Sequence, residues 1–425
     1  MGLSPSVKVF LNKLKWFIYE KTTSIFDRGL FILNISERKS KIAINSKVIV
    51  YVGEFLPPRI ARLAKWSKRF DEFTTVLLCH ERGFVEKFSN KDIDHIILFR
   101  NEWHLKRLVK SLPSPYVVHG FAPKSKYPYI AKEEWKKTDP SIPFIIDYQD
   151  VFTVYYGTIP KYNWLKEELP CEKACLSEAD GIIAHSLEPR EAMRIWGIKK
   201  SGKRMFFPLY ADDDYFSSSK ATKGNDELHL VYAGGVMGSH RDKAHYGLTQ
   251  FHWLIKDLED QKIHLHIYPS PSVIKADYEE YEEMAKHSAY FHYHTPVTQS
   301  KLHEELSKYH YGLMPFFSST SKQSDLKLKY ATTLKLFNYV EAGIPIIVSA
   351  DVLYQSWLVN RYSLGTIATT KEDFKDVRKL VGATPYKEQV TRLIANREDL
   401  SLKKHTPRLI EFYKTINWAK RPASF

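Results

Sequence analysis

Cysteine is scarce in this sequence, with three residues in 425. Cys79 stands alone, and Cys171 and Cys175 lie four apart in a stretch with helical periodicity. This spacing fits neither a disulfide framework nor a cysteine-rich zinc site, which favours a reducing, cytoplasmic setting. No run of eighteen or more apolar residues occurs, so the sequence predicts no membrane-spanning helix. A secretory signal is not expected either, because Lys13 and Lys15 interrupt the apolar N-terminal stretch.

Solenoid repeats and extended low-complexity segments are also missing. With 44% hydrophobic and 26% charged residues, the composition excludes a disordered or fibrous chain, and the length suffices for two domains. The formal net charge of +14 indicates an anionic partner: nucleic acid, an anionic membrane surface or a phosphorylated substrate. No motif of interleaved basic and aromatic residues points to a nucleic-acid module, so we predict no nucleic-acid partner.

Residues 1–46 form an extension before the first predicted strand, and their apolar residues recur at helical spacing. Residues 1–47 contain nine Lys or Arg against three acidic residues, a surplus of six positive charges. Two interpretations are open. A basic amphipathic helix of this kind binds the headgroup layer of an anionic membrane, or it packs on the first domain with a solvated basic face.

From residue 47 to residue 216 the pattern alternates between strands and helices, which predicts a parallel, doubly wound sheet. We expect strands at 47–52, 74–79, 95–99, 116–118, 144–147 and 181–185. Ligands of open α/β sheets bind beyond the carboxyl ends of the strands. The residues expected there are Gly53 and Glu54, His119 and Gly120, Asp147 to Asp150, and His185 and Ser186.

A linker at 217–227 precedes a second predicted domain over 228–400. Its first strand, 230–233, is followed by Gly234 and Gly235, with Arg241 and Lys243 nearby. Small residues after a strand let the backbone approach a phosphate, and basic side chains neutralise it. The last segment, 401–425, contains an aromatic-rich amphipathic helix predicted over 407–420.

The segment 334–349, LKLFNYVEAGIPIIVS, predicts a helix that ends at Gly343 and Pro345, followed by a short buried strand. Lys335 and Asn338 are three residues apart and share a face near the start of this helix. Free backbone N–H groups and the positive end of the helix dipole favour an anionic ligand there, such as a diphosphate.

This segment resembles the donor-site signature of GT-B fold glycosyltransferases, K-L-F-E-Y-x-x-x-G-x-P-V-V. The resemblance implies two Rossmann-like α/β domains facing a cleft, with a final helix that crosses back to the N-terminal domain. It implies that Lys335 binds the nucleotide diphosphate, together with Gly234, Gly235, Arg241 and Lys243. Asn338 stands where the family has a Glu that binds ribose. Glu341 replaces a residue that is small in the family, and it faces either the sugar or solvent.

Inverting glycosyl transfer needs a general base near the acceptor hydroxyl. Asp150 is the first candidate, since it follows the strand 144–147. The same region resembles that of membrane-associated glucuronosyltransferases of bacterial polysaccharide assembly, in which an Asp after this strand is the base. Asp147 and His119 are the alternatives.

No metal ligands are expected for catalysis. Asp212, Asp213 and Asp214 resemble a metal-binding D-x-D but lie in the linker region. His292 and His294 alternate on a strand and could bind a metal ion, but the favoured interpretation is a loop edge near the nucleotide base.

The sequence thus predicts a metal-independent glycosyltransferase without a cofactor, at the inner membrane face or free in the cytoplasm. Its expected partners are a nucleotide-sugar donor and a glycan or lipid-linked acceptor, with an anionic membrane surface as a further partner. One alternative is a nucleotide-sugar epimerase of the same fold, which needs no acceptor. The other is a basic binding protein without catalytic activity, whose positive charge would gather on one face instead of in a cleft.

Overall fold

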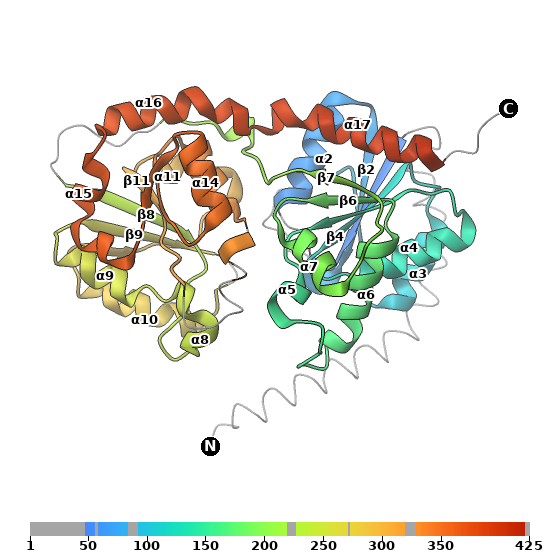
Figure 1. Cartoon of the computed structure of the whole chain (residues 1–425), viewed down its shortest axis with the longest axis horizontal. Helices are drawn as coiled ribbons and strands as arrows, with labels where there is room; N and C mark the ends of the chain where they lie inside the picture. The colour runs from blue at the N-terminus through green and yellow to red at the C-terminus, as the bar shows by residue number, and fades with distance from the viewer. Residues whose placement is uncertain are drawn as a thin grey trace, which may run out of the picture.

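The computed structural model describes residues 47–55, 58–83, 92–218, 227–270, 273–318, 326, 328–330 and 332–420. The extension predicted over residues 1–46 lies outside them. The described chain forms two α/β units, each built on a fully parallel sheet. Figure 1 shows these two units as separate lobes. The predicted α/β class with two Rossmann-like domains is confirmed.

The first sheet has the strand order β3-β2-β1-β4-β5-β6-β7. Its strands are β1 (Lys47–Gly53), β2 (Phe73–His80), β3 (His95–Phe99), β4 (Val117–Ala122), β5 (Phe144–Tyr148), β6 (Gly181–Ala184) and β7 (Lys203–Phe206). The helices between them are α2 (Pro58–Phe70), α3 (Glu102–Ser111), α4 (Lys126–Thr138), α5 (Phe152–Tyr156), α6 (Leu165–Glu178) and α7 (Glu188–Trp196). The order reverses between β1 and β4, which places the switch point of this sheet there.

The second sheet has the order β10-β9-β8-β11-β12-β13. Its strands are β8 (His229–Gly234), β9 (His264–Pro269), β10 (Phe291–Tyr293), β11 (Tyr311–Met314), β12 (Ile346–Ser349) and β13 (Gly365–Ala368). Its helices are α8 (Lys243–Tyr246), α9 (His252–Glu259), α10 (Lys275–Lys286), α11 (Gln299–Leu306), α13 (Leu334–Ala342), α14 (Leu353–Arg361), α15 (Val377–Gly382) and α16 (Tyr386–Asn396). The switch point here lies between β8 and β11.

Both faces of the first sheet are buried, as the apolar sequence of β1, KVIVYVG, predicts. Val48, Val50 and Val52 contribute to one hydrophobic cluster, whereas Ile49 and Tyr51 contribute to another. Because neighbouring residues of a strand point to opposite faces, the two clusters lie on opposite sides of the sheet. Helices therefore cover both faces of the sheet. Ligands can bind only at the ends of its strands.

The last helix, α17 (Leu402–Lys420), passes from the second unit to the first, as Figure 1 shows along its upper edge. Leu409, Ile410 and Tyr413 are buried in the core of the first unit. The helix starts five residues before the predicted Pro407, which lies inside it. Pro407 is the sixth residue of the helix, past the first turn, so its missing N–H removes one intrahelical hydrogen bond.

The first sheet differs from the prediction in the length of its fourth strand and in an additional edge strand. The fourth strand runs to Ala122 instead of residue 118, because VVHGFA is buried throughout and continues the pairing with β5. The edge strand β7 was not predicted. Its sequence KRMF has one buried residue, Met205, so it lacks the apolar run that marks the inner strands.

Among the described residues, the helices are all too short or too polar to cross a membrane.

Candidate donor and acceptor site

The position of α13 is fixed by Tyr339, the tyrosine of the LKLFNY segment. Its hydroxyl donates a hydrogen bond to the carbonyl of Leu313 at 3.0 Å and accepts one from the backbone N–H of Ala233 at 3.1 Å. Gly343 ends the helix in the left-handed conformation, with φ +71°, as predicted. The N-terminus of α13 is thereby held at the ends of β8 and β11, the switch point of the second sheet.

Lys335 and Gly234 come together at this switch point. A Cβ atom added to Gly234 would lie 2.2 Å from Cε and 2.8 Å from Nζ of Lys335, and the φ of Gly234 is +152°. The positive φ favours glycine here, and the end of the flexible Lys335 side chain fills the space that a Cβ atom would take. The ammonium lies 5.6 Å from the ring centroids of Tyr232 and Phe316. A cation, a helix N-terminus and a glycine turn thus meet at one point, which suits a diphosphate.

Gly235, Arg241 and Lys243, which were also predicted around the phosphate, do not contact the glycine turn in the way that Lys335 does. Gly235 has open space where a side chain would be. Arg241 pairs with both carboxylate oxygens of Asp277, at 2.8 and 2.9 Å, and this pair folds the loop after β8 onto α10. Lys243 is exposed at the start of α8. Of these basic residues, Lys335 is the one that lies against the glycine turn.

Asn338 is buried one turn after Lys335. Its side-chain oxygen accepts a hydrogen bond of 2.9 Å from Nε2 of Gln299, the first residue of α11. Gln299 was not predicted, because nothing in its local sequence marks it and its partner is 39 residues away. An amide pair has donors and acceptors left over, so Asn338 and Gln299 together offer neutral hydrogen-bonding groups where the family has a carboxylate.

Glu341 faces neither a sugar nor solvent, which corrects the prediction. It is 1% exposed, and Arg62 of α2 binds its two carboxylate oxygens at 2.5 and 3.1 Å. The backbone N–H of Asp212 donates to the same carboxylate at 2.8 Å. Burial alone would lower the pKa of Arg62, but the carboxylate outweighs it and holds this pKa above its ordinary value. Glu341 is a buried link between the two units.

His119 and Asp147 lie inside their strands and not beyond them, which corrects both placements. Asp147 is fully buried, with its Oδ2 atom 2.7 Å from Nε of Arg59 and 3.4 Å from Nε2 of His119. His119 is also fully buried, and its Nδ1 lies 2.8 Å from the hydroxyl of Tyr413. Burial raises the pKa of Asp147, but Arg59 and His119 lower it more, to about 2. An acceptor has no access to these two groups.

Asp150 is partly exposed and follows β5, as predicted. Its Oδ1 accepts a hydrogen bond of 2.7 Å from the hydroxyl of Tyr155, which also lies 3.0 Å from Glu188. Glu188 in turn accepts from the backbone N–H of Val151. Tyr155 and Glu188 were not predicted. Together they fix the orientation of the Asp150 carboxylate at the end of the first sheet.

The strand ends of the two sheets are joined next to α13. His185, directly after β6, lies with Nδ1 3.0 Å from the hydroxyl of Thr332, and Leu187 donates its N–H to the carbonyl of Tyr330 at 3.3 Å. Burial lowers the pKa of His185 to about 4, with the charge of Arg59 adding to the effect. These contacts bring the carboxyl edge of the first sheet, with Asp150, toward the residues that precede Lys335.

Known proteins resemble this chain in its fold and in part of its sequence. Residues 248–411 match the family described as the C-terminal domain of glucosyltransferase 3-like proteins. Sucrose-phosphate synthase from Thermosynechococcus elongatus superposes with a TM-score of 0.62 at 13% identity, over 88% of this chain and 100% of that one. The chain has the GT-B fold.

Two further solved structures share the GT-B fold. HepE from Anabaena, in complex with UDP, has a TM-score of 0.59 at 10% identity, over 87% of this chain and 100% of that one. A Listeria monocytogenes protein described as a UDP-N-acetylglucosamine 2-epimerase has a TM-score of 0.53 at 13% identity, over 90% of this chain and 100% of that one. No curated protein matches the chain in sequence.

The three consecutive aspartates near the GT-B domain linker bind protein groups. Asp212 pairs with Lys65 and accepts a hydrogen bond of 2.9 Å from Nε1 of Trp66. Asp214 pairs with Arg69 at 2.6 Å. These contacts hold the segment that connects the two units against α2. The carboxylates that resemble a D-x-D are therefore already bound to side chains of the protein.

Proposed function

We propose that the chain is a glycosyltransferase that moves a sugar from a nucleoside-diphosphate donor to a glycan or lipid-linked acceptor. The observation that carries this proposal is the side chain of Lys335 lying over Gly234 at the N-terminus of α13. The match of residues 248–411 to a glucosyltransferase-type domain supports it, as does the likeness of the fold to HepE with its bound UDP.

In the proposed reaction the C–O bond between the sugar and the diphosphate breaks, and the acceptor oxygen forms a new bond to the sugar carbon. Negative charge then grows on the leaving diphosphate. The ammonium of Lys335 and the N–H groups at the start of α13 stabilise that charge, which is how the residues of this site promote departure. The chemistry needs no cofactor, and a metal ion is not required for it.

Asp150 is the proposed general base, which accepts the proton of the acceptor hydroxyl. Its carboxylate is partly exposed, and the hydroxyl of Tyr155 orients it through a hydrogen bond of 2.7 Å. A base in this position implies inversion at the sugar carbon, since retaining enzymes of this fold dispense with it. Tyr155 and Glu188 are positioning residues in this account.

A cluster of aromatic side chains next to Asp150 is the proposed acceptor surface. The rings of Phe152, Tyr156, Tyr162 and Trp164 contact one another at centroid distances of 5.0 to 6.4 Å. Tyr162 is 45% exposed and Trp164 is 40% exposed. Exposed aromatic groups that are packed against each other mark a binding surface, and their flat apolar faces suit a sugar ring or an isoprenoid chain.

The test combines donor and acceptor. The full chain is incubated with UDP-, GDP- and TDP-sugars, with and without a lipid extract from glycan-producing bacterial membranes, and nucleotide release and sugar products are measured. Transfer requires the acceptor and falls by about a hundredfold in Asp150→Asn. The surface variant Glu411→Gln is the matched control and keeps full activity.

The same experiment separates the alternatives. The likeness to the Listeria protein favours the epimerase as the second candidate. An epimerase converts one UDP-sugar into its isomer, or releases free sugar, in the absence of any acceptor. That outcome, or the lack of turnover with every donor and acceptor, would contradict the transferase proposal.

We also propose that the chain works at the cytoplasmic face of a membrane in surface-polysaccharide synthesis. The basic extension of residues 1–46, which lies outside the described residues, supports this through its charge. Sedimentation with vesicles that contain anionic lipid tests it, and equal sedimentation with neutral vesicles would contradict it.

A further inference from the structure

Six histidines gather on the second sheet, outside the proposed donor and acceptor site. They are His229 on β8, His264 and His266 on β9, His292 on β10, His294 directly after β10, and His310 directly before β11. Several of their rings stack, and the closest pair, His229 and His264, has centroids 4.3 Å apart at an angle of 7°. A group of this size is unusual because imidazoles at such distances repel one another once they are protonated.

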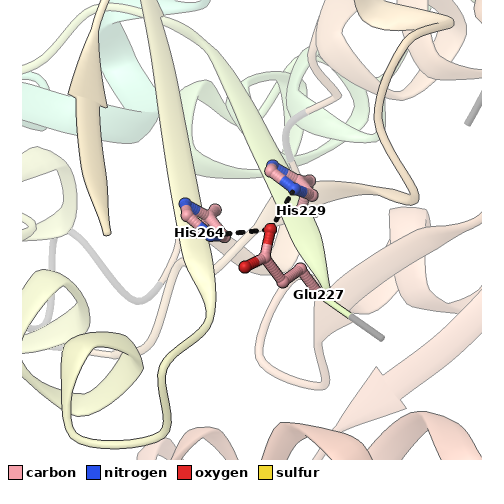
Figure 2. A group of neighbouring side chains, drawn as sticks. All are labelled: Glu227, His229 and His264. Carbon is pink, nitrogen blue, oxygen red and sulfur yellow. Dashed lines mark ion pairs between the residues drawn. The ribbon is translucent and has the colours of Figure 1, made fainter. Parts of the chain in front are cut away.

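Two of these histidines converge on a carboxylate. Figure 2 shows His229 and His264 on neighbouring strands, both directed at Glu227. The Nε2 atom of His264 lies 3.6 Å from Oε2 of Glu227, and Nε2 of His229 lies 3.9 Å from the same oxygen. One ligand atom from each residue lies within 4.8 Å of the other two, and Nε2 of His264 is buried without a hydrogen-bond partner.

The other ring nitrogens are engaged by a second layer of histidines. Nδ1 of His229 lies 3.0 Å from Nε2 of His266, and Nδ1 of His264 lies 3.0 Å from Nε2 of His292. In turn, Nδ1 of His266 lies 3.0 Å from Nε2 of His294. If Nδ1 of His229, His264 and His266 donates and the facing Nε2 atoms accept, these chains are satisfied and the Nε2 lone pairs of His229 and His264 point at Glu227. This is the tautomer that metal-binding histidines adopt.

We propose that Glu227, His229 and His264 bind a divalent transition-metal ion of the zinc type. Two imidazole nitrogens and one carboxylate oxygen form a set that zinc uses in proteins, and water completes the tetrahedron. Ligand atoms of tetrahedral zinc lie roughly 3.3 Å apart. The two N···O distances to Glu227, 3.6 and 3.9 Å, are slightly longer than this, and side-chain rotations of the three residues can close the difference. Glu227 has a half-exposed side chain, which leaves the site accessible.

The site lies at the amino edge of the sheet, whereas the proposed donor site lies at the carboxyl edge. His229 and Gly234 are the first and last residues of β8, so about 16 Å of strand separates the two sites. A bound ion would tie β8 to β9 close to the start of the second unit. Its role is therefore to stabilise this domain, and it takes no part in the proposed transfer.

The experiment uses the full chain without a histidine tag and zinc chloride alone as the probe. Calorimetric titration is expected to give one zinc ion per chain and a rise of the Tm, both reversed by a chelator. Cobalt substituted for zinc should give the visible absorption of a tetrahedral site. Binding should weaken about tenfold or more in Glu227→Gln and be lost in His264→Gln.

Two features keep the result decisive. Glu227 is exposed, so the Glu227→Gln variant should fold. It remains informative even if a substitution of His264 prevents folding. Glu283→Gln is the matched control, because Glu283 on α10 lies 2.9 Å from a single exposed histidine, His287, directly after that helix. Its zinc affinity should equal that of the unaltered chain. The absence of saturable binding, or a change of less than about threefold in Glu227→Gln, would overturn the proposal.

Discussion

The two ends of α13 differ in what their charged residues do. At the C-terminal end Glu341 is buried, and its carboxylate is held by Arg62 and by the backbone of Asp212. At the N-terminal end Lys335 is half-buried and lies over Gly234. One helix therefore joins the two domains through its last turn and presents a cation to a glycine turn through its first. Stability and ligand binding should respond separately to changes at the two ends.

The largest effect is expected at the C-terminal end. Arg62→Met leaves the carboxylate of Glu341 buried without its partner, which should cost about 3–5 kcal/mol in the free energy of unfolding. Chemical unfolding followed by tryptophan fluorescence measures this loss. The double variant Arg62→Met with Glu341→Met should regain most of it, because no uncompensated charge remains.

The nucleotide affinity of the folded Arg62→Met protein should be unchanged. If the nucleotide affinity falls as far as in a Lys335 variant, the two ends of α13 do not have separate roles. Glu341 would then belong to the ligand site.

At the N-terminal end, two adjacent glycines form a matched pair of variants. Gly234→Ala strains the backbone, whose φ is +152°, and displaces the end of the Lys335 side chain, so it should weaken nucleotide binding about thirtyfold, or by ~2 kcal/mol. Gly235→Ala meets open space and should change the affinity by less than about twofold. Equal losses in both variants would show that the close approach of Lys335 to Gly234 is not what the ligand requires.

His185, whose Nδ1 contacts Thr332 in the segment before α13, should make stability depend on pH because its side chain is buried. The pKa of His185 falls to about 4 in the folded protein, from 6.5, because of burial. The unfolded chain therefore binds the proton more readily, and stability is lost as the pH falls from 8 to 5. The loss from this residue is about 2 kcal/mol.

Unfolding measured at both pH values in the unaltered protein and in His185→Gln checks this effect. The variant should show a smaller loss of stability on acidification, whereas His287→Gln, at the exposed position directly after α10, should behave like the unaltered chain. An unchanged pH dependence in His185→Gln would contradict the assignment.

The smallest effect is expected for Tyr339→Phe, which removes the hydroxyl that joins α13 to β8 and β11. The loss of stability should be about 1 kcal/mol, because a buried N–H and a carbonyl lose their partner. Nucleotide affinity should fall about threefold through misplacement of the helix. Calorimetric titration measures the affinity, and thermal unfolding measures the stability. If neither the affinity nor the stability changes, packing alone positions α13.

Much of the fold was predictable, since apolar strands such as KVIVYVG and IIVS and the glycine after α13 are local signals. The contacts of Glu341 and Asp147 were not. Arg62 and Glu341 are 279 residues apart, and Arg59 and Asp147 are 88 apart. A sequence pattern carries no information on such pairs. His119 was misplaced for a different reason: β4 continues through the polar His and the Gly, which look like the end of a strand.

The central claim is that Lys335 binds the diphosphate of a nucleotide sugar, and calorimetry tests it most directly. UDP, GDP, ADP and TDP are titrated into the full chain, into Lys335→Met and into the control Lys308→Met, in which an exposed lysine is changed. We expect saturable binding of at least one nucleotide, weakened about tenfold or more in Lys335→Met and unchanged in Lys308→Met, with equal Tm values in the absence of ligand. No binding of any nucleotide, or equal affinity in Lys335→Met, would contradict the claim.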